Sequence, residues 1–256
     1  MNSIKHLIRE RIPASLLAWY RMKRQGRFAY LKYKTGGLLE PVIYERLYEE
    51  LQTAQDFDII EVGGASGTAS ISIAWAMQTA KMKSRLVVIE KCEGGTRDLY
   101  GDYRSNFERF NRFIREFGVA DRITLYAQYL TLENGAEVLN LLKSNWIAAL
   151  VIDADGHIHR DFFIFWKRLV EQGIIVIDDY HKNLTPKHAL TFRLLNQMVD
   201  WGLFEPVELI GTTYFGRKPS GGRFEALDLS SAQKIVDEVC EQFQVRFDKS
   251  GMHKMF

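Results

Sequence analysis

A glycine-rich turn between an apolar run and a helical pattern constrains this chain more than any other feature. Residues 58–62 are mostly apolar and predict a short, buried parallel strand. Three glycines, Gly63, Gly64 and Gly67, follow at once, and residues 68–77 predict a helix. Glycine lets a backbone approach a ligand closely, and a helix N-terminus offers unpaired N–H groups. The turn is either a ligand site or a tight strand–helix connection.

Two acids beside this turn favour the ligand site and indicate its chemistry. Glu61 stands two residues before the first glycine. A dinucleotide site normally has an apolar residue there, because a carboxylate would repel the pyrophosphate, whereas a carboxylate suits a cationic ligand. Residues 85–89 predict a second buried strand that ends at Glu90, where an acid is placed to accept hydrogen bonds from both ribose hydroxyls. The pattern therefore predicts a site for a cationic nucleoside.

Composition limits the size, partners and location of the protein. The 256 residues are 46% apolar, enough for one domain with a full core, and the net charge of +2 does not point to nucleic acid. Two cysteines, Cys92 and Cys240, do not form a disulfide framework, so we expect a cytoplasmic protein. No apolar run is long enough to span a bilayer, and we expect no signal peptide.

The ends of the chain predict extensions on either side of this domain. Residues 1–34 carry nine Lys or Arg against one acid, with apolar residues at helical spacing. Packing on the domain, or on a second copy in a homodimer, is favoured over peripheral contact with an anionic membrane. The segment 220–256 contains a helix over 230–243 whose role the sequence does not indicate. The predicted divisions are a basic extension at 1–35, a central domain at 36–219 and a helical extension at 220–256.

Further acids follow the next two predicted strands. Asp153 comes directly after an apolar run at 148–152, and Asp178 and Asp179 come after a run at 173–177. In an open α/β sheet, ligands gather outside the carboxyl ends of the strands, so these acids should converge with the two glutamates. Clustered carboxylates repel one another, and a divalent cation with oxygen ligands would account for the three aspartates. The alternative is that the pair at 178–179 begins the next helix and Asp153 contacts only the ligand.

The phrases that carry these residues resemble a known family. Residues 57–70 (FDIIEVGGASGTAS) resemble motif I of the class I S-adenosylmethionine (SAM) methyltransferases, and GVADRI at 118–123 and GRKP at 216–219 are similar to phrases found there. VIDAD at 151–155 and VIDDYH at 176–181 resemble the metal site of the cation-dependent O-methyltransferases of the catechol, caffeoyl-CoA and macrocin types. The resemblance implies a Rossmann-like, doubly wound, mostly parallel seven-stranded sheet that ends in an antiparallel hairpin.

The resemblance also implies a cofactor, a metal and a set of site residues. SAM would lie on Glu61, Gly63, Gly64, Ala65, Gly67, Thr68, Ser70, Glu90, Lys91, Gln128, Tyr129 and Asp153. A divalent cation, Mg²⁺ by preference, would lie on Asp153, Asp178 and Asp179. Relatives often have Gly-Asp beside the adenine, where this chain has Gln128, whose amide can still hydrogen-bond an adenine amino group.

One departure from the family concerns the catalytic base. Relatives often carry Lys or His three residues after the first metal-binding Asp, and here that residue is Gly156, which cannot transfer a proton. His157 is the favoured substitute and His181 the second candidate, with Asp153 as the third member of the predicted catalytic set. A metal would itself lower the pKa of a bound hydroxyl, so the missing base weakens the mechanism only in part.

These features together predict a SAM-dependent O-methyltransferase that acts on a small hydroxylated molecule with the help of a divalent metal. The alternative is a metal-independent or non-catalytic SAM-binding protein associated with a membrane or a partner. A NAD-dependent dehydrogenase would have an apolar residue at Glu61 and no terminal hairpin. A nucleic-acid methyltransferase would have a basic groove and an Asn/Asp-Pro-Pro-Tyr type motif, which the chain lacks, so we expect no nucleic-acid partner.

Overall fold

The computed structural model describes residues 14–92, 103–248 and 251–254. The helical pattern at residues 4–12 lies outside the described residues. In the described part, no helix is long and apolar enough to cross a membrane.

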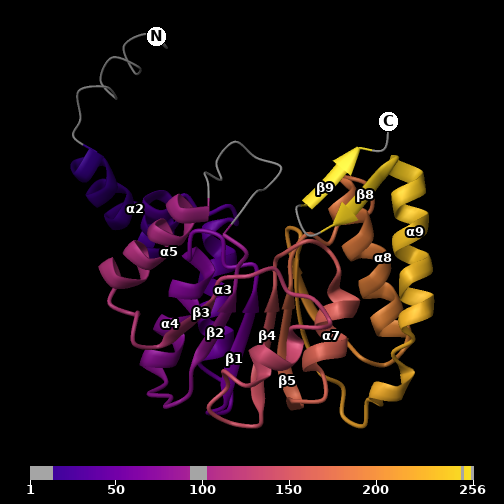
Figure 1. The fold of residues 1–256 in the computed structure, drawn as a ribbon. Helices are drawn as coiled ribbons and strands as arrows, with labels where there is room; N and C mark the ends of the chain where they lie inside the picture. The colour runs from indigo at the N-terminus through magenta and orange to yellow at the C-terminus, as the bar shows by residue number, and fades with distance from the viewer. Residues whose placement is uncertain (1–13, 93–102, 249–250, 255–256) are drawn as a thin grey trace.

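A mixed sheet with a parallel core forms the centre of the molecule (Figure 1). Five parallel strands run β3-β2-β1-β4-β5, and a terminal antiparallel hairpin adds β7 and β6, in that order, beside β5. Their bounds are β1 Asp58–Val62, β2 Leu86–Ile89, β3 Ile123–Tyr126, β4 Ile147–Ile152, β5 Leu169–Ile177, β6 Glu205–Ile210 and β7 Thr213–Arg217. The predicted doubly wound, seven-stranded sheet is thus confirmed, and its strand order reverses between β1 and β4, where such sheets bind ligands.

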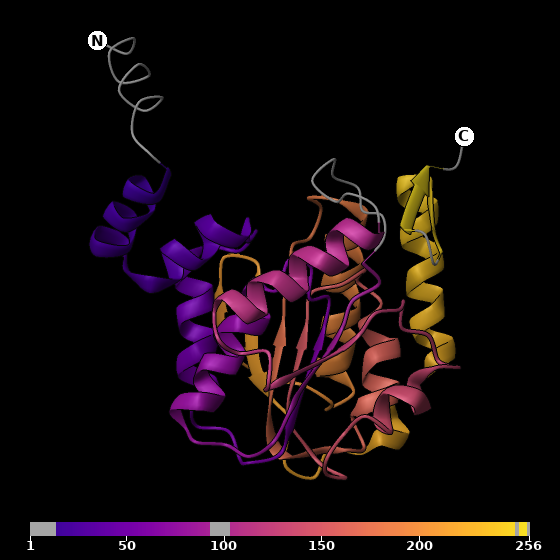
Figure 2. The same cartoon turned by 60° about the vertical axis from the view of Figure 1, so that its left-hand side comes forward.

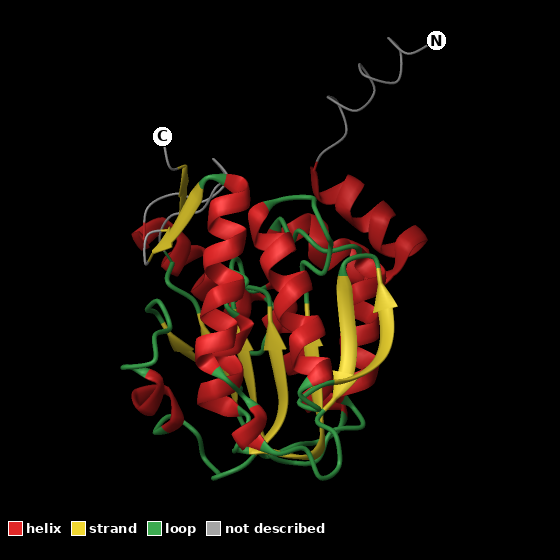
Figure 3. Ribbon diagram, turned by 90° about the vertical axis from the view of Figure 1, so that its right-hand side faces the viewer, coloured by secondary structure: helices red, strands yellow, loops and turns green. Residues whose placement is uncertain are grey.

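Helices cover both faces of the sheet (Figures 1 and 3). One face carries α2 Ala14–Thr35, α3 Pro41–Leu51, α4 Thr68–Thr79 and α5 Tyr103–Glu116, and the other carries α6 Gly135–Leu139, α7 Ile158–Phe165, α8 Pro186–Asp200 and α9 Leu229–Phe243. Successive strand residues alternate between the two cores, so Ile59 packs in the first layer and Ile60 in the second. Both strand faces are therefore apolar, as the continuous apolar runs predict.

Several element boundaries differ from those the sequence predicts. The residue pattern at 132–142 predicts a helix over that whole range, but only α6 forms there. The amphipathic, aromatic pattern at 162–170 predicts a helix over that range, but α7 ends at Phe165, because Leu169 already pairs with Ile147 of β4 at the start of β5. A small hairpin, β8 Val245–Asp248 and β9 Gly251–Lys254, follows α9 and was not predicted.

Helix α2 changes direction at Gly26, where φ is 80° and ψ is 173°. Before this kink the helix projects away from the sheet (Figure 2). After it, Phe28 and Leu31 are buried in the core with α3 and α4. The second half of α2 is thus part of the central packing.

Candidate active site

The glycine turn after β1 lies against the end of β4. Gly63 has a φ of +96°, and a Cβ atom there would lie 2.0 Å from the backbone oxygen of Asp153. Its N–H donates to the carbonyl of Ile89 at the end of β2, at 2.8 Å. Only glycine permits this approach, which brings the ends of three adjacent strands together.

Glu61 is a buried carboxylate with one free oxygen. Its side chain is buried in β1, and the Ser70 hydroxyl in the first turn of α4 donates to Oε2 at 2.5 Å. The other oxygen, Oε1, is buried and accepts no hydrogen bond from the described residues. Burial raises the pKa of Glu61 to about 8, the charges of Asp153 and Glu90 add to the rise, and the Ser70 hydrogen bond opposes it. Oε1 is therefore placed to receive a donor, and a cationic donor best of all.

Glu90 connects the turn to the end of β2. Its Oε2 accepts from the backbone N–H of Ala65 at 2.7 Å, and its Oε1 accepts from the N–H of Cys92 at 2.9 Å. Each carboxylate oxygen has a second lone pair, so these bonds leave acceptor capacity for a ligand. The Lys91 ammonium lies 6.0 Å from the ring centre of Tyr129.

The remaining predicted cofactor residues lie in the same turn and in the loop after β3. Gly67 precedes α4, and the hydroxyl of Thr68 at its first position lies 2.6 Å from that of Thr35 in α2. Gln128 accepts from the Tyr126 hydroxyl at 3.3 Å.

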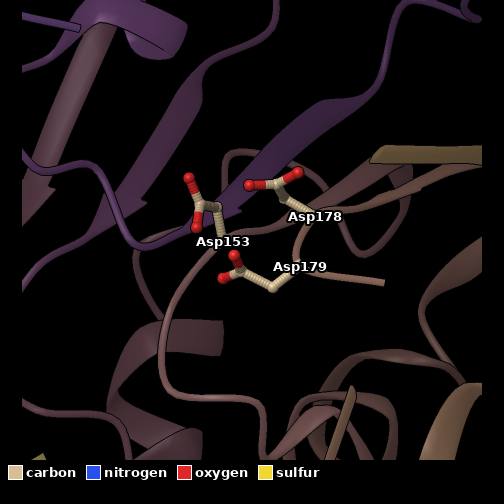
Figure 4. Close-up of side chains that lie close together, drawn as sticks. All are labelled: Asp153, Asp178 and Asp179. Atoms are coloured by element: carbon tan, nitrogen blue, oxygen red, sulfur yellow. The ribbon is translucent and has the colours of Figure 1, made fainter. Parts of the chain in front are cut away.

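Three aspartates meet at the ends of β4 and β5 (Figure 4). One carboxylate oxygen from each of Asp153, Asp178 and Asp179 lies within 4.8 Å of the others. The hydroxyls of Thr212 and Thr213 both donate to Asp178 Oδ1, at 3.1 and 2.5 Å. Burial, followed by repulsion from the other two carboxylates, raises the pKa of Asp153 above its usual range. The three residues predicted from the strand ends are thus brought together, and their charge calls for a cation.

Lys187 and His188, in the first turn of α8, provide partners for the aspartates that the sequence did not identify. Lys187 Nζ lies 3.2 Å from Asp153 Oδ1 and also pairs with Asp179 Oδ2. His188 Nε2 lies 3.0 Å from Asp179 Oδ1. Thr185 caps this helix by accepting the His188 N–H, and Pro186 follows it. The Thr-Pro start of a helix directly after an acidic strand end is the signal that could have located both residues.

A divalent cation does not fit among the three aspartates in this arrangement. The carboxylates are the hard oxygen ligands that Mg²⁺ prefers. However, the ammonium of Lys187 already bridges Asp153 and Asp179. A divalent ion on the same oxygens would lie close to a like charge. The metal would require Lys187 to leave.

His157 lies in a separate buried network. Its Nδ1 is 3.4 Å from Asp155 Oδ1, and its ring meets that of Phe247 edge-on with centres 5.1 Å apart. Asp155 also pairs with Arg160 at 2.8 Å and accepts from the Tyr129 hydroxyl at 2.5 Å. Although burial opposes it, Arg160 holds the pKa of Asp155 well below its usual range.

His181 is exposed beside the triad. Its Nδ1 accepts from the Asn183 N–H at 3.3 Å, and its ring lies edge-on to that of His188 with centres 6.3 Å apart. Within the described residues, neither His157 nor His181 forms an ion pair with the three aspartates. Their predicted role as base stays a prediction, and Lys187 and His188 are titratable groups that the fold places against the acids.

Comparisons with known proteins agree with this fold. Residues 60–180 match a family described as a methyltransferase domain. No curated protein matches the chain in sequence. The fold is similar to an O-methyltransferase from Bacillus cereus solved in complex with S-adenosylhomocysteine (SAH), at 15% identity and a TM-score of 0.56, over 79% of this chain and 97% of that one.

Two other solved structures have the same fold. The O-methyltransferase TomG from Streptomyces achromogenes, in complex with SAM, is 17% identical with a TM-score of 0.55, over 75% of this chain and 87% of that one. A putative caffeoyl-CoA O-methyltransferase from Staphylococcus aureus is 10% identical with a TM-score of 0.51, over 85% of this chain and 98% of that one. The predicted resemblance to the class I SAM-dependent methyltransferases is therefore confirmed, and the fold is theirs.

Proposed function

We propose that this protein is a SAM-dependent methyltransferase that moves a methyl group to an oxygen of a small hydroxylated molecule. The observation that carries the proposal is Glu61, whose buried Oε1, beside the glycine turn, has no hydrogen-bond partner in the part of the chain that the structure describes. The ammonium of SAM is a cationic donor of the kind this oxygen lacks. A dinucleotide would place its pyrophosphate over the same turn and meet the carboxylate unfavourably.

The other residues of the edge support the same ligand. The unused lone pairs of Glu90 would accept the ribose hydroxyls, and Gln128 and Tyr129 would flank the adenine. The three aspartates lie across the turn at the ends of β4 and β5. The acceptor would bind on that side, in line with the methyl group.

The reaction is a displacement in which positioning contributes most. An acceptor oxygen forms a bond to the methyl carbon while the bond from that carbon to sulfur breaks, and the sulfur keeps the electron pair. The sulfonium becomes the neutral thioether of SAH. The hydroxyl proton is released through the carboxylates of the cluster to water.

The resemblance also predicts a divalent cation on Asp153, Asp178 and Asp179. The meeting of three carboxylates favours it, and the ion pairs of Lys187 oppose it. When bound, such an ion would chelate acceptor oxygens and stabilise developing negative charge. The proposed methyl transfer does not depend on this outcome.

Turnover of SAM with a panel of catechols, phenols and hydroxylated sugars tests the proposal. We expect SAH to form faster with at least one acceptor than without any, together with a product heavier by one methylene. SAH binding without turnover on any hydroxylated acceptor would support the alternative, a non-catalytic SAM-binding protein.

A further inference from the structure

The charge balance at the three aspartates depends on a residue from an element that the metal hypothesis does not use. Lys187 extends from the first turn of α8, after the cap formed by Thr185. Its Nζ bridges Asp153 and Asp179, from β4 and from the end of β5. Its side chain is 29% exposed, so it is held within the site rather than on the outer surface.

Gly156 makes room for this lysine. Its φ is +85°, and a Cβ atom there would lie 3.1 Å from the backbone oxygen of Lys187 and 3.3 Å from the Thr191 hydroxyl. A side chain at residue 156 would thus crowd the first turns of α8. Residue 156, where relatives often carry a base, has no side chain here. The first turn of α8, which packs against Gly156, supplies Lys187 to the site instead.

The partners of the aspartates leave little space for a second cation. Four of the six carboxylate oxygens are already engaged: Asp153 Oδ1 and Asp179 Oδ2 by Lys187, Asp179 Oδ1 by His188, and Asp178 Oδ1 by two threonine hydroxyls. A divalent ion needs six or more oxygen ligands around it. It would have to displace the ammonium and break the charge-assisted contacts of Asp179.

We propose that Lys187 is the resident cation of this site, and that its ammonium takes the charge-balancing position that a divalent ion holds in the cation-dependent relatives. The lysine is a positioning residue that keeps the carboxylates of Asp153 and Asp179 together. The site therefore operates without bound metal. The catalytic part of this inference rests on the proposed function, whereas the cation-binding part does not.

Binding of Mn²⁺ to the full-length protein tests the inference, and it is measured as the loss of the paramagnetic resonance signal of the free ion. The wild type and Lys187→Arg should leave Mn²⁺ free. Lys187→Met vacates the position and should bind one ion per chain, about tenfold or more tighter than the wild type, because it removes the ammonium that pairs with Asp153 and Asp179. Lys182→Met, which removes an exposed lysine outside the cluster, is the matched control and should behave as the wild type.

The double variant Lys187→Met with Asp178→Asn should no longer bind the ion. Added Mn²⁺ should raise the unfolding temperature of the single variant Lys187→Met and of no other protein in the series. Stoichiometric Mn²⁺ binding by the wild type, displaced by Mg²⁺, would overturn the inference. So would a folded Lys187→Met protein that binds no ion.

If Lys187→Met does not fold, the rate of methyl transfer by the wild type, measured with and without chelator, tests the inference instead. Unchanged rates in excess chelator support the resident lysine, and rates lost in chelator and restored by Mg²⁺ overturn it. SAH affinity, measured separately by calorimetry, reports on the proposed function and does not depend on either result.

Discussion

At the scale of single residues, Glu61 carries a pH signature that can be measured. Burial raises its pKa to about 8 in the folded protein, so the folded state holds this proton more tightly than the unfolded state. Stability should fall as pH rises from the unfolded pKa of a glutamate, about 4.3, to about 8, and the loss should then be complete. The full effect is on the order of 3–5 kcal/mol.

Glu61→Gln should remove this dependence, because the amide oxygen can still accept the Ser70 hydrogen bond and carries no charge. We expect the variant to gain unfolding temperature over the wild type between about pH 5 and pH 9, by thermal denaturation without ligand. Glu241→Gln, an exposed site on α9, is the control and should show no such trend. An equal pH dependence in the wild type and Glu61→Gln would contradict the assignment of a strongly perturbed carboxyl.

His157 is a second residue whose role can be decided. Its ring packs against Phe247 and lies near Asp155, so His157→Gln should lower the unfolding temperature and change kcat/KM by less than about threefold. General-base catalysis contributes on the order of 10²–10⁴-fold. A loss of that size in kcat/KM with an unchanged unfolding temperature would show that His157 is the general base, as the sequence predicts.

At the scale of elements, helix α2 divides at Gly26 into a projecting half and a packed half. Deleting residues 1–25 should leave SAH affinity and unfolding temperature nearly unchanged. Deleting residues 1–34 should destabilise the protein, because it also removes Phe28 and Leu31, which are 6% and 0% exposed. Leu31→Ala alone should cost about 2–5 kcal/mol, the range for a large-to-small change in a core.

Denaturant unfolding of these three proteins measures the effect. Equal stability of the two truncated chains would show that the packed half of α2 is dispensable. Sedimentation with anionic vesicles tests the membrane alternative, which predicts binding by the full chain that is lost when residues 1–25 are removed.

The elements that the sequence predicted well are those set by local pattern. The strand at 58–62 and the helix predicted at 68–77 follow from an apolar run, turn glycines and a helical pattern that are close together in the chain. Helix α7 ends earlier than the local pattern predicts because Leu169 pairs with Ile147 of β4, a contact between segments distant in sequence that no local pattern records.

At the scale of the whole molecule, the sequence predicts those residues of the site that directly follow a strand. The convergence of Asp153, Asp178 and Asp179 follows from parallel strands whose carboxyl ends share one edge. Lys187 could not be found in this way, because it reaches the acids through the packing of α8 against the loop at Gly156. That contact joins segments that are distant in sequence, and it places a cation where local motifs predict a metal.

The central claim is that the edge of the sheet binds SAM through Glu61 and Glu90, and calorimetric titration with SAH tests it most directly. The account predicts that the wild type binds one SAH per chain. Glu61→Ala and Glu90→Ala should each weaken that binding by about 1–3 kcal/mol, the cost of losing a charge-assisted hydrogen bond. Unchanged affinity in both folded variants, or tighter binding of NADH than of SAH, would contradict it.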